Sequence, residues 1–260
     1  MKVVAIIQAR MTSTRLPGKV LKRASGRTML ERMLERVQQA RMVDQVVVAT
    51  TTDPTDDAIV KACRRYGTEV FRGSLQDVLD RYYQAAKYYQ ADIVVRLTAD
   101  CPLIDAQLID DVVDALIRNQ MDFACNRLPP PFTRTYPIGL DVEACTFAAL
   151  ESAWHNATQK HEREHVLPYL YSVPGRFKVL KLDHTEDLGH LRWTLDTPQD
   201  LILLRRIYRH FQGRNDFSWL NVLHLQLQEP QVFEVNAGIR HKTYLESEPV
   251  KIIENNEQGL

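Results

Sequence analysis

Apolar and polar positions alternate in a regular way through the first half of the chain, where short apolar runs separate longer stretches of mixed residues. Short apolar runs bounded by turn residues are typical of buried strands, whereas apolar positions spaced three and four apart are typical of helices. The pattern predicts strands at 3–8, 45–50, 69–71, 92–96 and 122–125. It predicts helices at 28–41, from 53 onward, at 76–89 and at 105–119. This βαβ alternation predicts an α/β fold with a doubly wound, mostly parallel, Rossmann-like sheet.

The alternation is interrupted by three consecutive prolines at 129–131. Residues 133–143 then predict a small β excursion outside the main sheet, after the fifth strand. Further along, the pattern predicts helices at 147–157 and 160–167, strands at 177–182 and 190–195, and a helix at 198–210. We expect a single domain over 1–253 with an insertion at about 128–175. The polar tail at 254–260 is expected to be flexible.

The overall charge changes this picture little, because 33 basic residues balance 33 acidic ones. Such a balance argues against a nucleic-acid partner bound through a general basic field. The four cysteines lie far apart without a C-x-x-C pair, which indicates reduced thiols and neither a disulfide framework nor a zinc site. The apolar run at 3–7 is too short for a signal peptide or a membrane span, so we expect a cytoplasmic protein without membrane association.

The loop after the first strand carries the strongest chemical signal. Residues 8–19 read Gln-Ala-Arg-Met-Thr-Ser-Thr-Arg-Leu-Pro-Gly-Lys, with cations at Arg10, Arg15 and Lys19. Ligands collect at the carboxyl ends of parallel strands, and Arg and Lys both suit phosphate oxygens. The loop is not a P-loop, because Ser13 stands where that motif has a glycine. It therefore predicts a phosphate site of another kind, with a solvated surface loop as the alternative.

This loop resembles the nucleotide-binding loop of the CMP-sugar synthetases, the cytidylyltransferases that activate nonulosonic and ulosonic acids. The order of residues in this loop is most similar to that of the spore-coat-polysaccharide branch. The resemblance covers about residues 1–210 and implies a sheet of the nucleotide-diphospho-sugar transferase type. It also implies that the loop wraps the triphosphate of CTP. The nucleotide-binding residues expected from it are Ala9, Arg10, Ser13, Arg15, Lys19, Arg72, Arg81 and Thr98.

Two aspartates follow predicted strands and are candidate magnesium ligands. Asp100 comes after the strand at 92–96, and Mg²⁺ prefers carboxylate oxygens together with water and nucleotide phosphates. Asp196 precedes Pro198, and the alternative for it is an ordinary cap at the start of a helix. The alternative for Asp100 is a structural residue in a turn. The resemblance implies that both bind Mg²⁺, which is the cofactor expected here. The expected catalytic residues are Arg10, Lys19, Asp100 and Asp196.

The segment around Arg72 and Arg81 departs from the family pattern. Sugar-acid relatives often carry a Ser-Gly-Thr-acid-Arg core here, whereas this chain keeps the acid-Arg pair at 80–81 and has Asp-Val-Leu at 77–79. Both arginines remain candidates for phosphate or base contacts. Arg81 could instead pair with Asp77 on the surface of one helix. The departure leaves the preference for cytosine open.

Residues 161–165 read His-Glu-Arg-Glu-His and formally match the H-E-x-x-H zinc pattern. The predicted βαβ order of elements does not suit a zinc protease, and Pro168 would end the helix soon after His165. The resemblance instead implies that this segment lies on the acceptor side, where Arg163 and His165 would bind an acidic group. Surface charge on a helix is the alternative.

Residues 136–143 are similar to the acceptor-lining or dimer-forming strand of the family, and Asp141 lies between apolar neighbours that would point to the core. Arg192 stands on the strand leading to Asp196. The acceptor-binding residues expected from these segments are Tyr136, Asp141, Arg163, His165 and Arg192.

Together these signals predict a Mg²⁺-dependent cytidylyltransferase that transfers CMP from CTP to a small acidic acceptor and releases pyrophosphate. The acceptor is a nonulosonic or similar sugar acid, or alternatively a phosphonate or phosphorylated small acid. A glycosyltransferase-like or nucleotide-sugar-binding protein of the same fold is a second possibility, although no Asp-x-Asp triplet follows a strand. A non-enzymatic interaction module is a third. The resemblance implies a homodimer.

Overall fold

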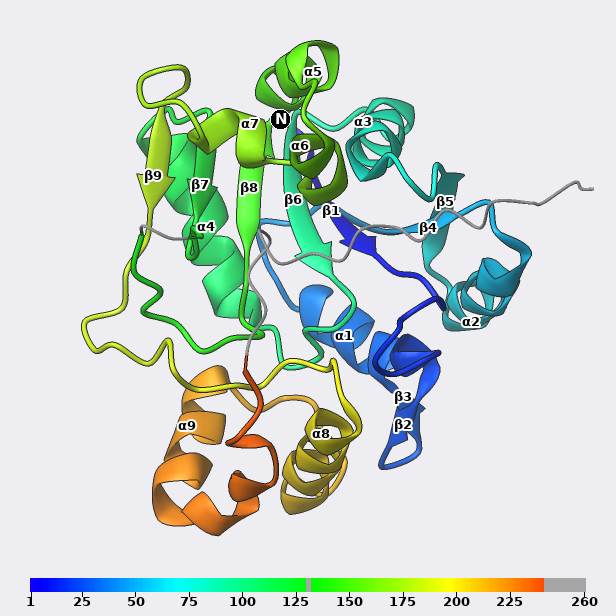
Figure 1. Cartoon of the computed structure of the whole chain (residues 1–260), viewed down its shortest axis with the longest axis vertical. Helices are drawn as coiled ribbons and strands as arrows, with labels where there is room; N and C mark the ends of the chain where they lie inside the picture. The colour runs from blue at the N-terminus through cyan, green and yellow to red at the C-terminus, as the bar shows by residue number, and fades with distance from the viewer. Residues whose placement is uncertain (130–131, 241–260) are drawn as a thin grey trace, which may run out of the picture.

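The computed structural model describes residues 1–129 and 132–240. Across these residues one seven-stranded sheet has the order β5-β4-β1-β6-β8-β7-β9 (Figure 1). Its strands are β1 (Val3–Gln8), β4 (Gln45–Thr51), β5 (Glu69–Gly73), β6 (Ile93–Thr98), β7 (Phe123–Cys125), β8 (Glu143–Thr146) and β9 (Val179–Lys181). A separate short hairpin pairs β2 (Arg23–Ala24) with β3 (Arg27–Thr28). The α/β class and the mostly parallel sheet expected from the sequence are confirmed.

Helices cover both faces of the sheet. They are α1 (Met29–Val37), α2 (Asp57–Tyr66), α3 (Val78–Tyr88), α4 (Ala106–Arg118), α5 (Phe147–Asn156), α6 (Lys160–His165), α7 (Pro168–Tyr171), α8 (Pro198–His210) and α9 (Trp219–Gln228). Single 3₁₀ turns are η1 (Lys19–Leu21), η2 (Pro54–Asp56), η3 (Pro230–Val232) and η4 (Glu234–Asn236). Several helix starts follow from local side chains, since Thr28 and Glu31 form the expected capping box and Thr197 and Asp200 form another.

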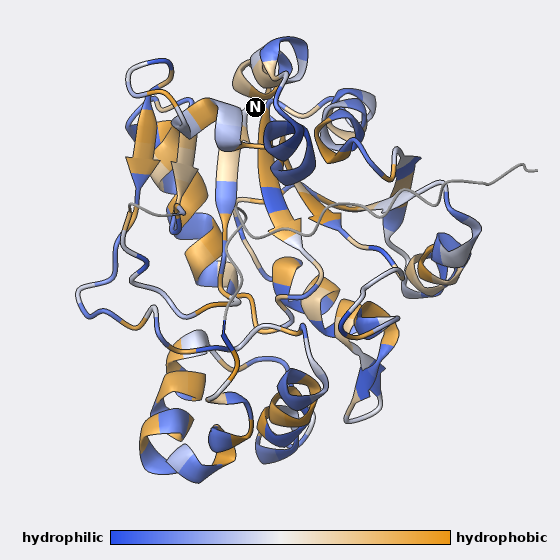
Figure 2. Ribbon diagram, viewed as in Figure 1, coloured by the Kyte–Doolittle hydropathy of each residue, from blue (hydrophilic) through white to orange (hydrophobic). Residues whose placement is uncertain are grey.

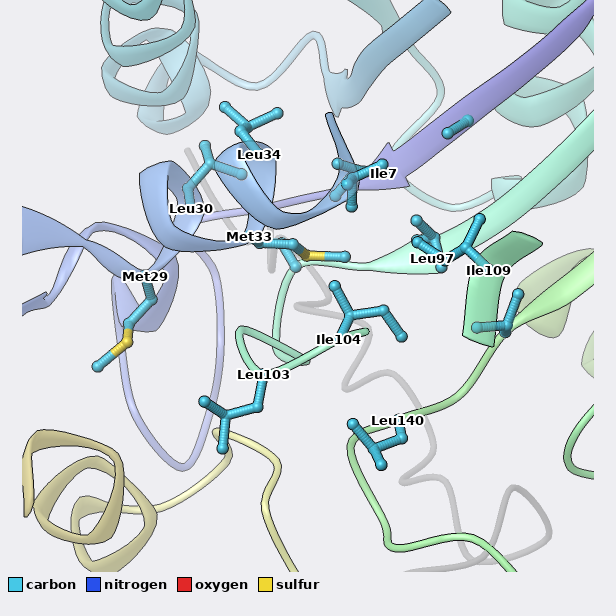
Figure 3. Packing of buried hydrophobic residues seen from close by; sticks show 14 of the residues in the cluster. Ile7, Met29, Leu30, Met33, Leu34, Leu97, Leu103, Ile104, Ile109 and Leu140 are labelled. Atoms are coloured by element: carbon cyan, nitrogen blue, oxygen red, sulfur yellow. The ribbon is translucent and has the colours of Figure 1, made fainter. Parts of the chain in front are cut away.

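The two faces of the sheet belong to two apolar clusters. On β1, Val3, Ala5 and Ile7 point toward α1, α2 and α4, whereas Val4 and Ile6 point toward α3 and α5. Figure 2 shows the resulting apolar character of the central strands, and Figure 3 shows α1 and the loop after β6 packing around Ile7 on the first face. Strands buried on both faces explain why their sequences read as continuous apolar runs.

Strand β8 runs against its neighbours, antiparallel to both β6 and β7. The chain leaves β7 at the edge where β1, β4 and β6 also end, crosses residues 126–142, and enters β8 from the same edge. Gln8, Thr98, Arg127 and Glu143 therefore stand at this carboxyl edge. The sheet order thus gathers segments that are far apart in the sequence.

Two expected β segments are wrong. Residues 190–195 do not form a strand: Trp193 donates to the Ile138 carbonyl at 2.7 Å, and Leu195 donates to the Asp100 carbonyl at 2.8 Å. The segment bonds to two different neighbours in turn, so only a single bridge, Ile138 with Arg192, takes the β pattern. Residues 133–143 form no β excursion beyond that bridge, and the strand that follows them, β8, joins the main sheet.

Other expected elements differ at their ends. The helix expected at 28–41 ends at Val37, and the segment expected as one helix at 160–167 is α6 followed by the short helix α7. Pro130, Pro131 and the expected tail at 254–260 lie outside the described residues, as does the end of the expected domain. In the described ranges no helix is long and apolar enough to cross a membrane. The four cysteines are buried free thiols.

Gly139 provides a test of this packing, because its φ is +108° and an added Cβ would lie 2.7 Å from the backbone N of Thr194. We expect Gly139→Ala to lower the free energy of unfolding by about 3 kcal/mol, since neither backbone segment can move aside. Gly175→Ala is the matched control, with φ +80° and open space around the new methyl group. It should cost about 1 kcal/mol. Urea denaturation measures both, and equal losses would contradict the close approach.

Candidate active site

The ammonium group of Lys19 lies between two carboxylates that come from distant parts of the chain. Its Nζ donates to Asp100 Oδ2 and to Asp196 Oδ1, each at 2.7 Å. Arg15 adds an ion pair to Asp196 at 3.2 Å. The structure therefore brings together the basic loop and both aspartates singled out in the sequence. Two surface cavities of about 330 and 320 Å³ lie elsewhere, beside Gly67 and Val179, so charge and not a cavity identifies this site.

The basic loop is held in place by its own turn and by a buried carboxylate. Gly18 adopts φ +65° and donates its N–H to the Met11 carbonyl at 2.9 Å, which places Lys19 at the start of η1. Asp56 is 1% exposed and accepts the N–H of Met11 at 2.7 Å. It also accepts hydrogen bonds from Thr50 and Thr51 at the end of β4. These contacts hold the loop against two strands without the help of a ligand.

The two aspartates are fixed to each other through the backbone. Leu195 N–H and the Thr194 hydroxyl both donate to the carbonyl of Asp100, at 2.8 and 3.0 Å. This pair of bonds ties the residue before Asp196 to Asp100 itself. The two carboxylates thereby reach one cation, the ammonium of Lys19.

Electrostatics in this cluster favour the charged forms. Burial alone would lower the pKa of Lys19, but the adjacent Asp100 and Asp196 more than offset this and raise it. Burial would raise the pKa of Asp100, but Lys19 and a hydrogen bond from Thr98 bring it down to about 2. At neutral pH Lys19 is therefore an ammonium and Asp100 a carboxylate. A doubly acidic, partly accessible pair of this kind can also accept a metal cation.

A buried ion pair supports Asp196 from behind. The guanidinium of Arg192 donates to both carboxylate oxygens of Asp200, at 3.0 and 2.8 Å, and contacts Asp196 at 3.4 Å. Asp200 is fully buried and accepts the N–H groups of Asp196 and Thr197, each at 2.9 Å. Asn236 adds a further hydrogen bond to Asp200 at 2.9 Å. Asp200 therefore orients the backbone that carries Asp196.

The other expected nucleotide-binding residues fall into two groups. Ala9 and Thr98 lie at the carboxyl edge of the sheet, and Arg10 and Ser13 belong to the basic loop. Arg72 and Arg81 instead make contacts away from Lys19. The Arg72 guanidinium donates to the carbonyls of Thr51 and Asp53 and to the Asp57 carboxylate, and the buried Arg81 donates to the Ser74 carbonyl. The alternative surface pair between Arg81 and Asp77 is wrong, since Arg81 is 3% exposed.

The expected acceptor residues also separate. The carboxylate of Asp141 accepts two hydrogen bonds from the guanidinium of Arg134. Burial lowers the pKa of His165, and His165 is close enough to Arg96 and Arg127 for their positive charges to lower its pKa further. Arg192 belongs to the Lys19 cluster. Arg163 and Tyr136 are engaged elsewhere.

The Arg163 guanidinium binds the Asp77 carboxylate, with Nη2 at 2.5 Å, and donates to the Trp154 carbonyl at 2.7 Å. The Tyr136 ring packs on His184 and Trp219, with ring centroids 5.6 and 5.7 Å away. The structure does not bring these two residues to Lys19, and their roles in binding an acceptor stay predictions.

Several residues that build the site were not singled out in the sequence. Asp56 and Asp200 hold its segments in place, and Arg127 and Glu143 lie elsewhere along the same carboxyl edge of the sheet. Asp200 alone carried a local signal, because Thr197-Pro198-x-Asp200 is a capping pattern that points a carboxylate back at the helix start. The other three read as ordinary polar residues, since their partners lie far away in the sequence.

Comparison with known proteins identifies similar chains. The family model described as cytidylyltransferase matches residues 4–217. The chain is 30% identical over 235 residues to the spore coat polysaccharide biosynthesis protein SpsF of Bacillus subtilis, covering 88% of this chain and 95% of that one.

Solved structures agree with this match. A cytidylyltransferase from Leptospira borgpetersenii superposes with a TM-score of 0.86 at 37% identity, covering 93% of this chain and all of the other. A CMP:2-keto-3-deoxy-manno-octonic acid synthetase in complex with CTP gives a TM-score of 0.63 at 21% identity, covering 81% of this chain and all of that one. The second likeness concerns the fold.

Asp200 offers a test of the support behind Asp196. Asp200→Asn puts an amide donor among groups that all donate, and it leaves the buried Arg192 without its carboxylate. We expect a loss of about 3 kcal/mol in the free energy of unfolding. Asp216→Asn is the control, since its carboxylate is largely exposed and pairs with Arg214 at 3.8 Å, and it should change stability by less than about 0.5 kcal/mol. Urea denaturation at neutral pH separates the two.

The same variant predicts a pH dependence. Burial would raise the pKa of Asp200, but hydrogen bonds from Arg192 and Asn236 lower it below its ordinary value of 3.8. A carboxylate with a lowered folded-state pKa stabilises the fold above the pKa of the unfolded chain and loses this effect as pH falls through the folded-state pKa. The stability difference between wild type and Asp200→Asn should therefore be constant near neutral pH and shrink below about pH 4. A difference that does not change with pH would contradict this assignment.

Proposed function

This chain belongs to the cytidylyltransferase family, and we propose that it transfers CMP from CTP to a small acidic acceptor in a Mg²⁺-dependent reaction. The observation that carries the proposal is the convergence of Lys19, Asp100 and Asp196 at the carboxyl edge of the sheet. This edge is where ligands bind in open α/β sheets. The acceptor is a sugar acid or a phosphonate or phosphorylated small acid.

The residues at this edge fit a magnesium ion. Asp100 and Asp196 already share one cation, the Lys19 ammonium, and both keep oxygens near a common point. In the described part of the chain no three His, Cys, Asp or Glu side chains are grouped as a complete metal cage. Two carboxylates completed by water and nucleotide phosphates are the usual environment of Mg²⁺. When bound there, the ion would neutralise phosphate charge and polarise the attacking oxygen.

The chain's own residues then act mainly by position and charge. An acceptor oxygen forms a bond to the α-phosphorus of CTP, the bond from that phosphorus to the bridging oxygen breaks, and pyrophosphate leaves with the electron pair. The acceptor proton passes to solvent. Lys19, Arg15 and Arg10 offset the charge that develops on the leaving pyrophosphate. Lys19 and Arg15 reach this task by exchanging their carboxylate partner for phosphate oxygens.

A panel assay tests the proposal directly. We expect pyrophosphate release with CTP, Mg²⁺ and one member of a panel of sugar acids, phosphonates and phosphorylated acids, faster than with ATP, GTP or UTP. Asp100→Asn, Asp196→Asn and Lys19→Met should each lower kcat/KM by about 100-fold or more, because each removes a charge that the transition state needs. Lys178→Met, at an exposed lysine, is the matched control and should leave the rate unchanged.

The assay can also contradict the proposal. Tight binding of a nucleotide sugar without pyrophosphate release from any pair of substrates would favour the glycosyltransferase-like alternative. Unchanged activity in Asp100→Asn would remove that residue from the metal site. The homodimer and the cytoplasmic location stay predictions.

A further inference from the structure

Positive charge is concentrated on one part of a chain that is neutral overall. The segments 20–35 and 201–216 together carry eight basic residues and three acidic ones, a net charge of +5, whereas the whole chain has 33 of each kind. They form the hairpin β2–β3 with most of α1, and most of α8 with the turn after it. The neighbouring segment 229–236 adds two glutamates, so the excess stays positive. The fold therefore collects a positive charge that the balanced composition does not reveal.

Hydrogen bonds hold the two basic segments against each other. The guanidinium of Arg32 is fully buried and donates to two carbonyls of the hairpin, at 3.1 and 3.0 Å, and to the Gly213 carbonyl after α8, at 2.6 Å. At the surface the Nε of Arg205 donates to the Arg23 carbonyl at 2.9 Å. Figure 1 shows the hairpin beside α8. The two segments therefore form one continuous surface.

Most cations on this surface have no carboxylate partner. Glu31 belongs to the capping box of α1. Glu35 forms an ion pair with Arg27, and Asp216 lies 3.8 Å from the arginine two residues before it. In the ranges 1–129 and 132–240, no carboxylate lies within ion-pair distance of the other surface cations on these segments. These cations, called the basic face below, are Lys22, Arg23, Arg205, Arg206 and Arg209.

The basic face begins next to the candidate active site. The N–H of Lys22 donates to the Lys19 carbonyl at 3.1 Å, across the turn η1. From the other side, α8 begins two residues after Asp196. A rise of about 1.5 Å per residue places Arg205 and Arg209 about 10 and 16 Å along the helix from its start. The face thus extends from the site outward along the surface.

The charges inside the site cancel, so they attract a distant anion only weakly. The Lys19 cluster contains three cations and three carboxylates. The triphosphate of CTP carries several negative charges, and the basic face presents a net positive field to it before it reaches Lys19. A surface of one sign beside a site raises the association rate of a charged ligand by about 10- to 1,000-fold, and the gain falls steeply with ionic strength.

We propose that the basic face attracts CTP and guides it to the Lys19 cluster. This inference rests on the proposed function. The face acts on the encounter and touches none of the reacting atoms, so it raises the association rate constant of CTP and leaves kcat unchanged. The Debye length is about 30 Å at 0.01 M ionic strength and about 8 Å at 0.15 M, so the effect is large at low salt and small at high salt. A nucleotide with fewer phosphates is attracted less.

Stopped-flow fluorescence tests the proposal with N-methylanthraniloyl derivatives of CTP and CMP. The test variant combines Arg23→Gln, Arg205→Gln and Arg209→Gln, which are exposed positions. We expect its association rate constant for the CTP derivative to fall by about fivefold at 0.02 M ionic strength and by less than about 1.5-fold at 0.3 M. The fall should be smaller for the CMP derivative. The dissociation rate constant and kcat should stay within about twofold of wild type.

Two further variants separate charge from structure. The same three positions changed to lysine keep the charge but lose the guanidinium hydrogen bonds, and this variant should associate with CTP as wild type does. Lys61→Gln, Arg64→Gln and Arg65→Gln together remove the same charge from exposed positions on α2, whose last turn leads to the amino end of β5. This matched control should leave the association rate constant within about 1.5-fold of wild type. Should the triple glutamine variant fail to fold, Arg209→Gln alone should lower the constant by about 1.7-fold at 0.02 M.

Three results would overturn the inference while leaving the proposed function intact. One is an association rate constant for CTP that is equal in wild type and the glutamine variants at 0.02 M. Another is the same loss in the lysine variant. The third is a loss that neither shrinks with salt nor differs between CTP and CMP. If wild type bound no CTP and released no pyrophosphate with any acceptor, the proposed function itself would be overturned, and this inference with it.

Discussion

The contact on which the site depends is the ion pair of Lys19 with Asp100 and Asp196. It joins the loop after β1, the loop after β6 and the segment before α8, which are separated by 81 and 177 residues from Lys19 in the sequence. Hydrogen bonds of the backbone also hold each of the three segments in place, so few side-chain conformers are needed to bring the three charged groups together. Removing the lysine would leave two partly buried carboxylates facing each other, which is why this one contact constrains three segments at once.

The loops around this contact share one structural device. Buried carboxylates accept backbone N–H groups that no strand or helix can satisfy, and so replace missing secondary structure at the edge of the sheet. The residues that do this are Asp56 for Met11 and Thr51, Asp105 for Trp219, and Asp200 for Asp196 and Thr197. Each such carboxylate is costly to bury and is compensated by several donors. The device gives irregular segments the rigidity that a charged site needs.

Local patterns were enough to predict the parallel strands of the sheet, but not the path of the chain between and after them. The strands ending at Gln8 and Thr51 are buried on both faces, and such runs are readable one at a time. Residues 190–195 were misread because an apolar segment can satisfy its backbone on two neighbours in turn. The basic loop and the two aspartates were found through motifs. Arg127 was not, since an arginine after a strand looks like a surface residue until the fold shows that Asp141 and Glu143 lie near it.

The charges of the first cluster at this edge, around Lys19, balance one another, and this balance constrains how a ligand can bind there. Lys19, Arg15 and Arg192 face Asp100, Asp196 and Asp200, so the first cluster is neutral and stable without a ligand. Moving Lys19 to a phosphate would leave Asp100 without its ion-pair partner, while Asp196 would keep Arg15 and Arg192. Under the proposed function, phosphate binding by Lys19 and cation binding by the aspartates would therefore be coupled. Under the proposed function, nucleotide binding at this edge would therefore depend on a divalent cation.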